Sequence, residues 1–306
     1  MQAHRDSIMQ NEYQEAYWSR RFSKEGHTGY EDKVIYLYDQ PLRVRSVKGI
    51  LKRLFPSGLK GKSAFDAGCG TGDFINLLLK LGAETVHSAD ISLKVTELTG
   101  NRFSSLGARV NVIAGAIQSM ELPEKLFDVA TCVTVLQHII DDNEVVAVLG
   151  RLEKALKRDG FIIALEISPF RNSGHDEPGI LRERSLAEWQ AIISNAGLFL
   201  VMEPVVYSPL GFCAVQLWLP SFIKKFIGTH KIEPNAGMPI TEIPEHSSFS
   251  FKRSIKRKSY NLLKRLILLI TYPVDYLFVF KVPRNRAHYH IFVLQKKQTY
   301  NDVAAH

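Results

Sequence analysis

Between Lys62 and Leu200, short apolar runs rich in β-branched and aromatic residues alternate with longer segments whose apolar residues recur at helical spacing. This alternation predicts βαβ units, and hence a parallel sheet with helices on both faces. The predicted strands are Ser63–Ala67, Thr85–Asp90, Arg109–Ala114, Phe127–Val133, Gly160–Ile167 and Leu198–Val205. The predicted helices are Gly72–Leu81, Ser92–Leu106, Asp141–Leu156 and Ser185–Asn195, the last with a capping box formed by Ser185 and Glu188.

The segments on either side of this pattern predict additions to the core. Apolar residues at helical spacing from Asp39 to Leu54 indicate that residues 1–60 form a helical cap, and the core then covers residues 61–205. Residues 206–284 fit neither pattern and are interpreted as a helical insertion before the last strand. That strand is predicted at Tyr289–Gln295, within residues 285–297, and residues 298–306 are expected to form a loose tail.

The cysteines and the N-terminal segment bear on the cellular compartment. The chain has 306 residues and three cysteines, Cys69, Cys132 and Cys213, which are far apart and show no metal-binding or disulfide spacing. The first residues include Arg5 and Asp6 and lack the apolar core of a secretion signal. We therefore expect a reducing, cytoplasmic setting.

Basic residues gather in one part of the predicted insertion. The formal net charge is +8, and much of the excess precedes or lies within an apolar run, at Lys252, Arg253, Lys256, Arg257, Lys258, Lys264 and Arg265. No aromatic and basic RNA-binding signature is present, so anionic lipid or an anionic glycolipid is favoured over nucleic acid. The run is interrupted by Pro273 and is shorter than the roughly 20 residues that span a bilayer. A lid, a peripheral membrane contact and an oligomer interface all remain open.

Candidate cofactor chemistry begins with the sequence AFDAGCGTGDF, which follows the first predicted strand and opens a helix. Gly68, Gly70 and Gly72 would let the backbone turn sharply and approach a ligand closely. The first turn of the following helix would present free N–H groups. A glycine-rich turn alone does not identify the ligand, because dinucleotide dehydrogenases have one too.

Two acidic residues narrow the choice of cofactor. Asp66 stands two positions before the first glycine, where a negative charge would repel a pyrophosphate and could hold an ammonium group. Asp90 ends the second predicted strand, where a carboxylate can accept hydrogen bonds from ribose hydroxyls. Together these charges favour S-adenosylmethionine (SAM) over a dinucleotide.

These motifs resemble those of the class I SAM-dependent methyltransferases of the UbiG-like, small-molecule type. DAGCGTG matches the glycine motif, Asp90 the ribose acid, FDVATCVTVLQHI the fourth strand and its loop, and LKRDGFIIALE the fifth strand. The resemblance implies a Rossmann-like fold with a seven-stranded, mostly parallel sheet, and SAM as the cofactor. The implied cofactor contacts are Asp66, Gly68, Cys69, Gly70, Gly72, Asp90, Ile91, Ala116, Ile117, Val133 and Thr134, with Ala116 and Ile117 at the adenine. Many relatives have an acidic residue near Ala116, whereas GAIQSM has none and offers Gln118 instead.

Two residues at the carboxyl ends of the strands are candidates for catalysis. His138 follows the fourth strand, and with an ordinary pKa of about 6.5 its imidazole could accept a proton from a hydroxyl acceptor. Glu166 closes the fifth strand and could orient the acceptor. A packing role for His138 and an ion-paired or solvated state for Glu166 are the alternatives. No metal site is expected.

The sequence therefore predicts a methyltransferase acting on a small-molecule, glycan or lipid-linked acceptor, with oxygen as the preferred acceptor atom. N-methylation of a small amine and a catalytically silent SAM-fold binding protein are the alternatives. Arg182 and Arg184 precede a predicted helix and could contact an anionic acceptor, although a solvated loop is the favoured interpretation. The expected location is cytoplasmic, with the membrane surface as a second possibility.

Overall fold

The computed structural model describes residues 2–30, 32–171, 176–177, 179–215, 249–277 and 287–296, and the side chains of residues 2–8 and 249–259 are not among what it describes. The chain divides into two compact units. The first comprises residues 1–33, 43–207 and 281–306, and the second residues 34–42 and 208–280. Residues 216–248 and 278–284 of the predicted insertion, residues 285, 286 and 297 of the predicted last-strand segment, and the predicted tail lie outside the described residues, so the predicted boundaries stay predictions.

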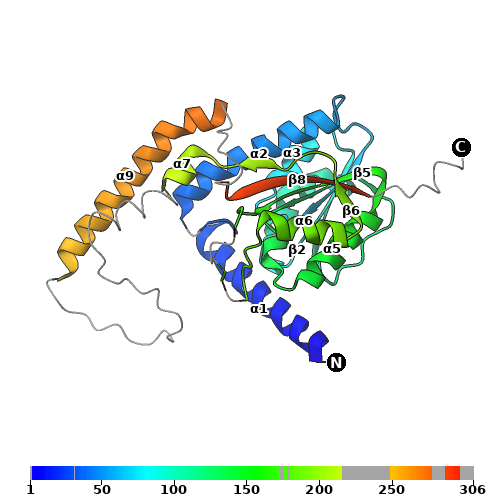
Figure 1. Cartoon of the computed structure of the whole chain (residues 1–306), viewed down its shortest axis with the longest axis horizontal. Coiled ribbons are helices and arrows are strands. Elements are labelled where there is room, and N and C mark those ends of the chain that lie inside the picture. Colours follow the sequence, from blue (N-terminus) through cyan, green and yellow to red (C-terminus); the bar gives the residue numbers. More distant parts are fainter. Residues whose placement is uncertain are drawn as a thin grey trace, which may run out of the picture. The chain divides into compact units, whose positions relative to one another are not determined.

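The first unit is built on one mixed sheet (Figure 1). Its strands are β1 (Ser63–Ala67), β2 (Thr85–Asp90), β3 (Val110–Ala114), β4 (Phe127–Val133), β5 (Leu156–Ile167), β6 (Leu198–Leu200), β7 (Val205–Tyr207) and β8 (Tyr289–Lys296). The order is β3-β2-β1-β4-β5-β8-β6, with β7 also pairing with β8. Strands β1 to β5 pair in parallel, whereas β8 is antiparallel to β5, β6 and β7. The expected Rossmann-like, mostly parallel sheet is confirmed.

The predicted sixth strand, Leu198–Val205, is divided in the structure. Strand β6 ends at Leu200 and β7 begins at Val205, and Pro204 lies in the break. Because proline has no N–H to donate to a ladder, it interrupts a strand at this point. Both short strands pair with β8, so the part of the chain that the structure describes forms a sheet of eight strands where the sequence predicts seven.

The helices of this unit match the predicted ones closely. They are α3 (Asp73–Lys80), α4 (Leu93–Phe103), α5 (Asp142–Ala155) and α6 (Leu186–Asn195), with 3-10 turns η1 (Ser104–Arg109) and η2 (Leu136–His138). Ser185 and Glu188 form the predicted capping box at α6. The helix predicted to reach Leu106 changes to a 3-10 turn at Ser104, ahead of Gly107 with its φ of 55°.

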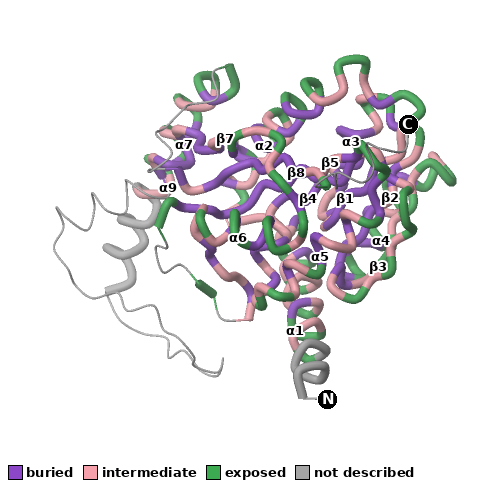
Figure 2. The backbone as a smooth tube through the Cα atoms, turned by 45° about the vertical axis from the view of Figure 1, so that its right-hand side comes forward, coloured by how far each residue is buried: buried purple, intermediate pink, exposed green. Residues whose placement is uncertain are grey.

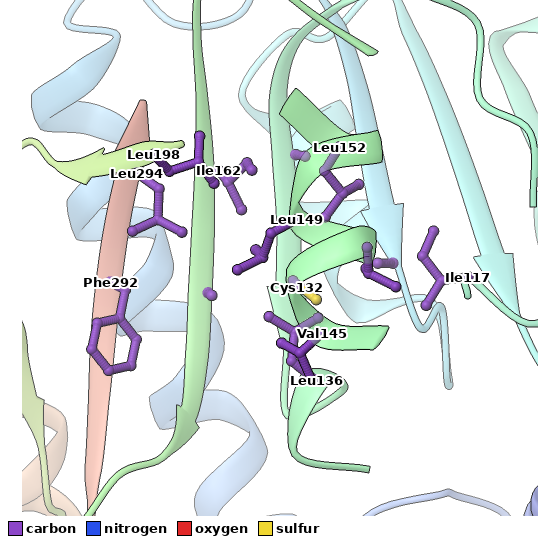
Figure 3. Packing of buried hydrophobic residues seen from close by; sticks show 14 of the residues in the cluster. Ile117, Cys132, Leu136, Val145, Leu149, Leu152, Ile162, Leu198, Phe292 and Leu294 are labelled. Carbon is purple, nitrogen blue, oxygen red and sulfur yellow. The ribbon is translucent and has the colours of Figure 1, made fainter. Parts of the chain in front are cut away.

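The core of the unit lies between the sheet and the helices. Figure 3 shows Val145, Leu149 and Leu152 of α5 pointing toward Cys132 of β4 and Ile162 of β5, and all five are almost fully buried. Strands β1, β4 and β5 are buried along most of their length (purple in Figure 2), as expected for parallel strands covered on both faces. The core therefore fixes the central strands, whose carboxyl ends carry the candidate site.

Two helices precede the sheet, α1 (Gln2–Glu25) and α2 (Lys33–Leu54). Residues 34–42 of α2 belong to the second unit, together with α7 (Leu210–Cys213) and α9 (Phe249–Leu277). The carboxylate of Asp275 in α9 accepts hydrogen bonds from the backbone N–H groups of Leu210 and Gly211, at 2.7 and 2.9 Å, and from the Tyr38 hydroxyl. Among the described residues, no helix is long and apolar enough to cross a membrane.

Candidate functional site

The loop between β1 and α3 requires glycine for steric reasons. Gly68, Gly70 and Gly72 have φ angles of 75°, 47° and 79°, in the left-handed region that other residues rarely adopt. A Cβ on Gly68 would lie 2.4 Å from Cγ2 of Val135, and one on Gly72 would lie 2.6 Å from Cε2 of Phe103. The predicted glycine motif is therefore a compact turn with surrounding side chains packed directly onto it.

Asp90 ties this turn to the end of β2. Its Oδ2 accepts from the Gly70 N–H and its Oδ1 from the Ser92 N–H, both at 3.0 Å. The Gly68 and Cys69 N–H groups donate to the carbonyl of Ala89 at 2.7 and 3.0 Å. Burial raises the pKa of Asp90, although both N–H donors favour its ionised form. The carboxylate thus holds two loops together and retains lone pairs for a further donor.

Asp66 is a buried carboxyl with one unused oxygen. The Thr131 hydroxyl donates to Oδ1 at 2.7 Å, whereas Oδ2 has no hydrogen-bond partner among the described residues. The residue is 1% exposed, and this burial raises the pKa of Asp66 to about 8. An unpaired buried carboxylate oxygen is costly, so this atom is suited to a ligand donor.

The remaining predicted cofactor residues lie at or just after the carboxyl ends of β1, β2, β3 and β4. Ile91 is partly exposed, and Cys69, Ala116, Ile117 and Val133 are buried. The Gly115 N–H donates to the Asp90 carbonyl at 2.9 Å, so the loop after β3 lies beside the loop after β2. Thr134 directly follows β4 with a φ of 55°, and its N–H donates to the Leu165 carbonyl at 2.7 Å.

These residues meet at the carboxyl edge of four adjacent strands. Strands β2 and β3 lie on one side of β1, whereas β4 and β5 lie on its other side. The order of the strands therefore reverses between β1 and β4. Ligands of open α/β sheets bind at such a reversal. The structure therefore brings the predicted cofactor residues of all four loops to one place.

His138, at the end of η2, has a defined tautomer. Its Nδ1 lies 2.7 Å from the Ile180 carbonyl, which can only accept, so Nδ1 carries the hydrogen and Nε2 carries the lone pair. Burial lowers the pKa of His138 to about 4, and nearby Arg21 and Arg43 lower it further against the raising effect of the carbonyl. The imidazole is therefore neutral near pH 7, with Nε2 able to accept a proton.

Glu166 stabilises the loop that carries His138. Its Oε1 accepts from the N–H groups of Val135 and Leu136 at 3.1 and 3.0 Å, and its Oε2 accepts from the Gln137 N–H at 3.1 Å. The residue has no exposed surface, and burial raises its pKa to about 8 despite these three donors. The solvated state given as an alternative for Glu166 is wrong, because the residue is fully buried, and its predicted catalytic role remains a prediction.

The comparisons with known proteins agree on the kind of domain. A family model described as a methyltransferase domain matches residues 64–160. The ubiquinone biosynthesis O-methyltransferase of Cupriavidus pinatubonensis is 29% identical over 56% of this chain and 71% of its own length. The enzyme of the same name from Methylococcus capsulatus is 28% identical over 56% of this chain and 75% of its own. Residues 64–160 are a methyltransferase domain of the class I, SAM-dependent kind.

Solved structures support the methyltransferase fold. A SAM-dependent methyltransferase from Leishmania major superposes with a TM-score of 0.51 at 18% identity, covering 63% of this chain and 75% of that one. SpnF, described as a cyclase, superposes with a TM-score of 0.50 at 15% identity, covering 82% of this chain and 80% of that one. At such identities the likeness shows the fold alone, and a protein described as a cyclase shares it.

The methyltransferase's own residues fit SAM as the cofactor. The buried Oδ2 of Asp66 lacks a partner, and SAM has an ammonium group and a positively charged sulfonium to offer. A pyrophosphate would bring negative charge to the same place, where Asp66, Asp73 and Asp90 already interact unfavourably. The charge at the turn after β1 therefore fits a cationic cofactor.

The sequence predicts a helical cap at residues 1–60 but does not indicate which residues of α1 contact this site. The Gln14 amide donates to the carbonyls of His138 and Gly179 at 2.5 and 3.1 Å, and the Ser19 and Ser92 hydroxyls are 2.7 Å apart. The Trp18 ring meets the His138 ring edge-on with centroids 4.7 Å apart. No motif in α1 indicates these contacts, because they arise only when the helix packs on the loops after β2 and β4.

Arg184 is a second residue whose role the sequence misassigned. It has no exposed surface, so its assignment to a solvated loop is wrong. Its Nε donates to Asp142 Oδ1 at 2.7 Å, and Nη2 donates to the Ile139 carbonyl at 2.7 Å. Arg184 therefore fixes the backbone after η2, next to His138. Its neighbour Arg182 remains half-exposed and pairs with Asp142 at 2.9 Å.

Arg43 of α2 also reaches the loop after β4. Its guanidinium donates to the Thr134 hydroxyl at 3.1 Å and to the Tyr30 hydroxyl at 2.5 Å. It lies over the rings of Tyr30 and Tyr289, 5.1 and 5.5 Å from their centroids. The side of the site next to Thr134 is consequently aromatic and positively charged.

Proposed function

We propose that the protein transfers the methyl group of SAM to a hydroxyl oxygen of a small-molecule acceptor, with His138 as the general base. The observation that carries the proposal is the tautomer of His138: Nδ1–H is held by the Ile180 carbonyl, which directs the lone pair to Nε2. Gln137 supports this arrangement, because its Oε1 accepts from the Ile167 N–H at 3.0 Å and its Nε2 lies 3.4 Å from His138 Nε2. An acceptor hydroxyl that forms a hydrogen bond with Nε2 would meet a neutral imidazole.

The cofactor contacts are assigned by position. Asp66 would bind the methionine ammonium through Oδ2, and Asp90 would accept from the ribose hydroxyls. Gly68, Cys69, Gly70 and Gly72 would border the methionine portion, together with Val133 and Thr134. Ile91, Ala116 and Ile117 would contact the nucleoside. Gln118 donates through Nε2 to Asn11 at 3.3 Å, and its Oε1 would be placed to accept from the adenine amino group.

The reaction requires positioning more than acid chemistry. SAM supplies an electrophilic methyl group whose sulfur leaves without protonation. The protein must align the acceptor oxygen with that methyl group and exclude competing water. As the oxygen–carbon bond forms, the hydroxyl proton would pass to Nε2 of His138. Glu166 and Arg184 would act as positioning residues, because both hold the loop that presents His138.

The acceptor is proposed from the relatives and from the aromatic side of the site. The relatives are named for O-methylation in ubiquinone biosynthesis, which favours a phenolic hydroxyl in a quinone precursor. The aromatic and cationic surroundings of Thr134 suit such a ring. Glycan or lipid-linked hydroxyls belong to the same acceptor class, and a cytoplasmic location with peripheral contact to the membrane would give access to them.

The test combines cofactor binding with acceptor profiling. Isothermal titration calorimetry measures SAM binding, and transfer of a labelled methyl group to matched phenols, sugars and aromatic amines identifies the acceptor atom. His138→Ala should retain SAM affinity and acceptor KM and lower kcat by roughly a hundredfold or more. Labelled amine products would instead identify nitrogen as the acceptor atom. Tight SAM binding without turnover on any acceptor would favour a silent SAM-binding protein.

A further inference from the structure

Helix α9 is amphipathic in the opposite sense to a helix of a water-soluble fold. Its buried positions recur at helical spacing and are largely polar: Lys264, Leu268 and Asp275 are 7%, 3% and 2% exposed, and Thr271 lies on the same face. Such a helix ordinarily turns its apolar residues inward and its charges toward water. In α9 the buried face instead holds the charged residues Lys264 and Asp275.

The exposed face of α9 is correspondingly apolar. Leu269 and Ile270 are 71% and 72% exposed, and Leu262 and Leu277 are 60% and 63% exposed. We use the name apolar face of α9 for Leu262, Leu266, Leu269, Ile270, Val274 and Leu277, all of which are exposed. Single exposed leucines are common, but a continuous stripe along four turns of one helix indicates a surface that is covered in use.

The polar residues of the buried face have partners that hold this orientation. Asp275 accepts from the N–H groups of Leu210 and Gly211, and the Thr271 hydroxyl lies 3.0 Å from that of Tyr38. Rotating α9 to bury its leucines would break these hydrogen bonds, so the apolar face stays outward.

The charge of α9 identifies what covers this face. The helix has seven basic residues, namely Lys252, Arg253, Lys256, Arg257, Lys258, Lys264 and Arg265, and one acidic residue, the buried Asp275. Its sequence thus starts with a basic segment and continues into the apolar face, along one continuous helix (Figure 1). Adjacent basic and leucine-rich segments suit a bilayer interface with anionic headgroups. An apolar protein partner would not account for the excess of positive charge.

We infer that the apolar face of α9 is a docking surface for an anionic lipid bilayer, in which the leucines enter the headgroup region while the basic segment neutralises lipid phosphates. This deepens the proposed membrane contact and does not depend on methyl transfer. Docking would bring the second unit to the lipid bilayer, in which hydrophobic acceptors dissolve.

The experiment uses the full chain and vesicle co-sedimentation. Wild-type protein should bind phosphatidylcholine vesicles containing phosphatidylglycerol and bind vesicles of phosphatidylcholine alone at least about tenfold more weakly. The double variant L269E/I270E should lose about tenfold or more of the binding to anionic vesicles, because two apolar groups would be replaced by repelled charges. Leu98→Glu, which changes an exposed leucine on α4, is the matched control and should bind like the wild type.

Two further measurements separate the contributions and the rival occupants. K256Q/R257Q/K258Q should weaken binding to anionic vesicles only, and added salt should weaken wild-type binding in the same way. SAM affinity, which reports on the first unit, should be unchanged in each variant. Unaltered vesicle binding by L269E/I270E would overturn the inference. A wild-type dimer in sedimentation velocity that becomes monomeric in L269E/I270E, with no vesicle binding by either, would assign the face to a second copy.

Discussion

The Thr131 hydroxyl of β4 donates to Oδ1 of Asp66 on the neighbouring strand β1 at 2.7 Å and leaves Oδ2 without a hydrogen-bond partner among the described residues. One oxygen is thus held in place by the sheet, and the other is suited to accept a hydrogen bond from a ligand. Because the carboxyl is buried, its pKa is raised to about 8, so it is mostly protonated at neutral pH before the cofactor binds. This gives cofactor binding a measurable link to pH.

SAM binding is therefore expected to release close to one proton at pH 6.5, because the Asp66 carboxyl must ionise to pair with the ammonium group. Affinity should rise by roughly tenfold per pH unit below about pH 7 and level off near pH 8. Calorimetry in buffers of different ionisation enthalpy measures the proton count. Asp66→Asn should bind weakly with no such pH slope, and an unchanged proton release in that variant would contradict the assignment.

The same raised pKa predicts how stability without cofactor depends on pH. Between about pH 4 and pH 8 the unfolded carboxyl is ionised while the folded one keeps its proton, so Asp66 makes the free energy of unfolding fall as pH rises. In Asp66→Asn this decline should be shallower. Denaturant titrations at pH 5, 6.5 and 8 measure it, and equal slopes in both proteins would exclude the shift.

For His138, the lowered pKa predicts an activity profile unlike that of an ordinary histidine. With a pKa of about 4, Nε2 stays unprotonated down to mildly acidic pH, so kcat should show no decline with a midpoint near 6.5. The measurement is kcat between pH 5 and 8 at saturating acceptor. A midpoint near 6.5 that disappears in His138→Gln would mean that the catalytic imidazole is exposed rather than buried.

Gly68 offers a test of the turn at the cofactor site, with Gly197 as a matched control. Both have a φ of 75°, but a Cβ on Gly197 would meet nothing within 4 Å, whereas one on Gly68 would be 2.4 Å from Val135 Cγ2. Gly197→Ala should cost about 1 kcal/mol of unfolding free energy, from the left-handed backbone alone. Gly68→Ala should cost about 1 to 3 kcal/mol more and weaken SAM binding. Equal effects of the two substitutions would argue against the close packing.

Asp275 should stabilise the second unit through its buried hydrogen bonds. Asp275→Asn keeps one acceptor oxygen and takes the carboxylate acceptor from the N–H of Leu210 or Gly211, of which only Gly211 has a second acceptor among the described residues, the Tyr38 hydroxyl; the loss should cost about 1 to 3 kcal/mol. Hydrogen exchange at these two amides should accelerate, while SAM affinity stays unchanged. Tyr38→Phe removes the hydroxyl that donates to the same carboxylate and accepts from the Gly211 N–H at 3.2 Å. Because Asp275 still accepts from both N–H groups in that variant, the effect on the two amides should be smaller.

Glu166 shows how sequence position and structural role can diverge. Its place at the end of β5 predicts a carboxylate at the rim of the sheet, and the strand does end there. Whether that carboxylate faces a substrate or the backbone depends on where the loop after β4 runs. The three N–H groups of residues 135–137 converge on it, and no local pattern in the sequence encodes that convergence.

The sequence by itself determined the alternation of strands and helices, the glycine turn and the acids at the ends of β1 and β2, because each depends on local spacing or on a sterically required residue. Only the tertiary structure decided which residues of α1 lie on the site, that Arg184 is buried, and that α9 turns its leucines outward. These features depend on contacts between residues far apart in the chain. Local propensity carries no information about such contacts, whereas packing and the need to pair buried polar groups determine them.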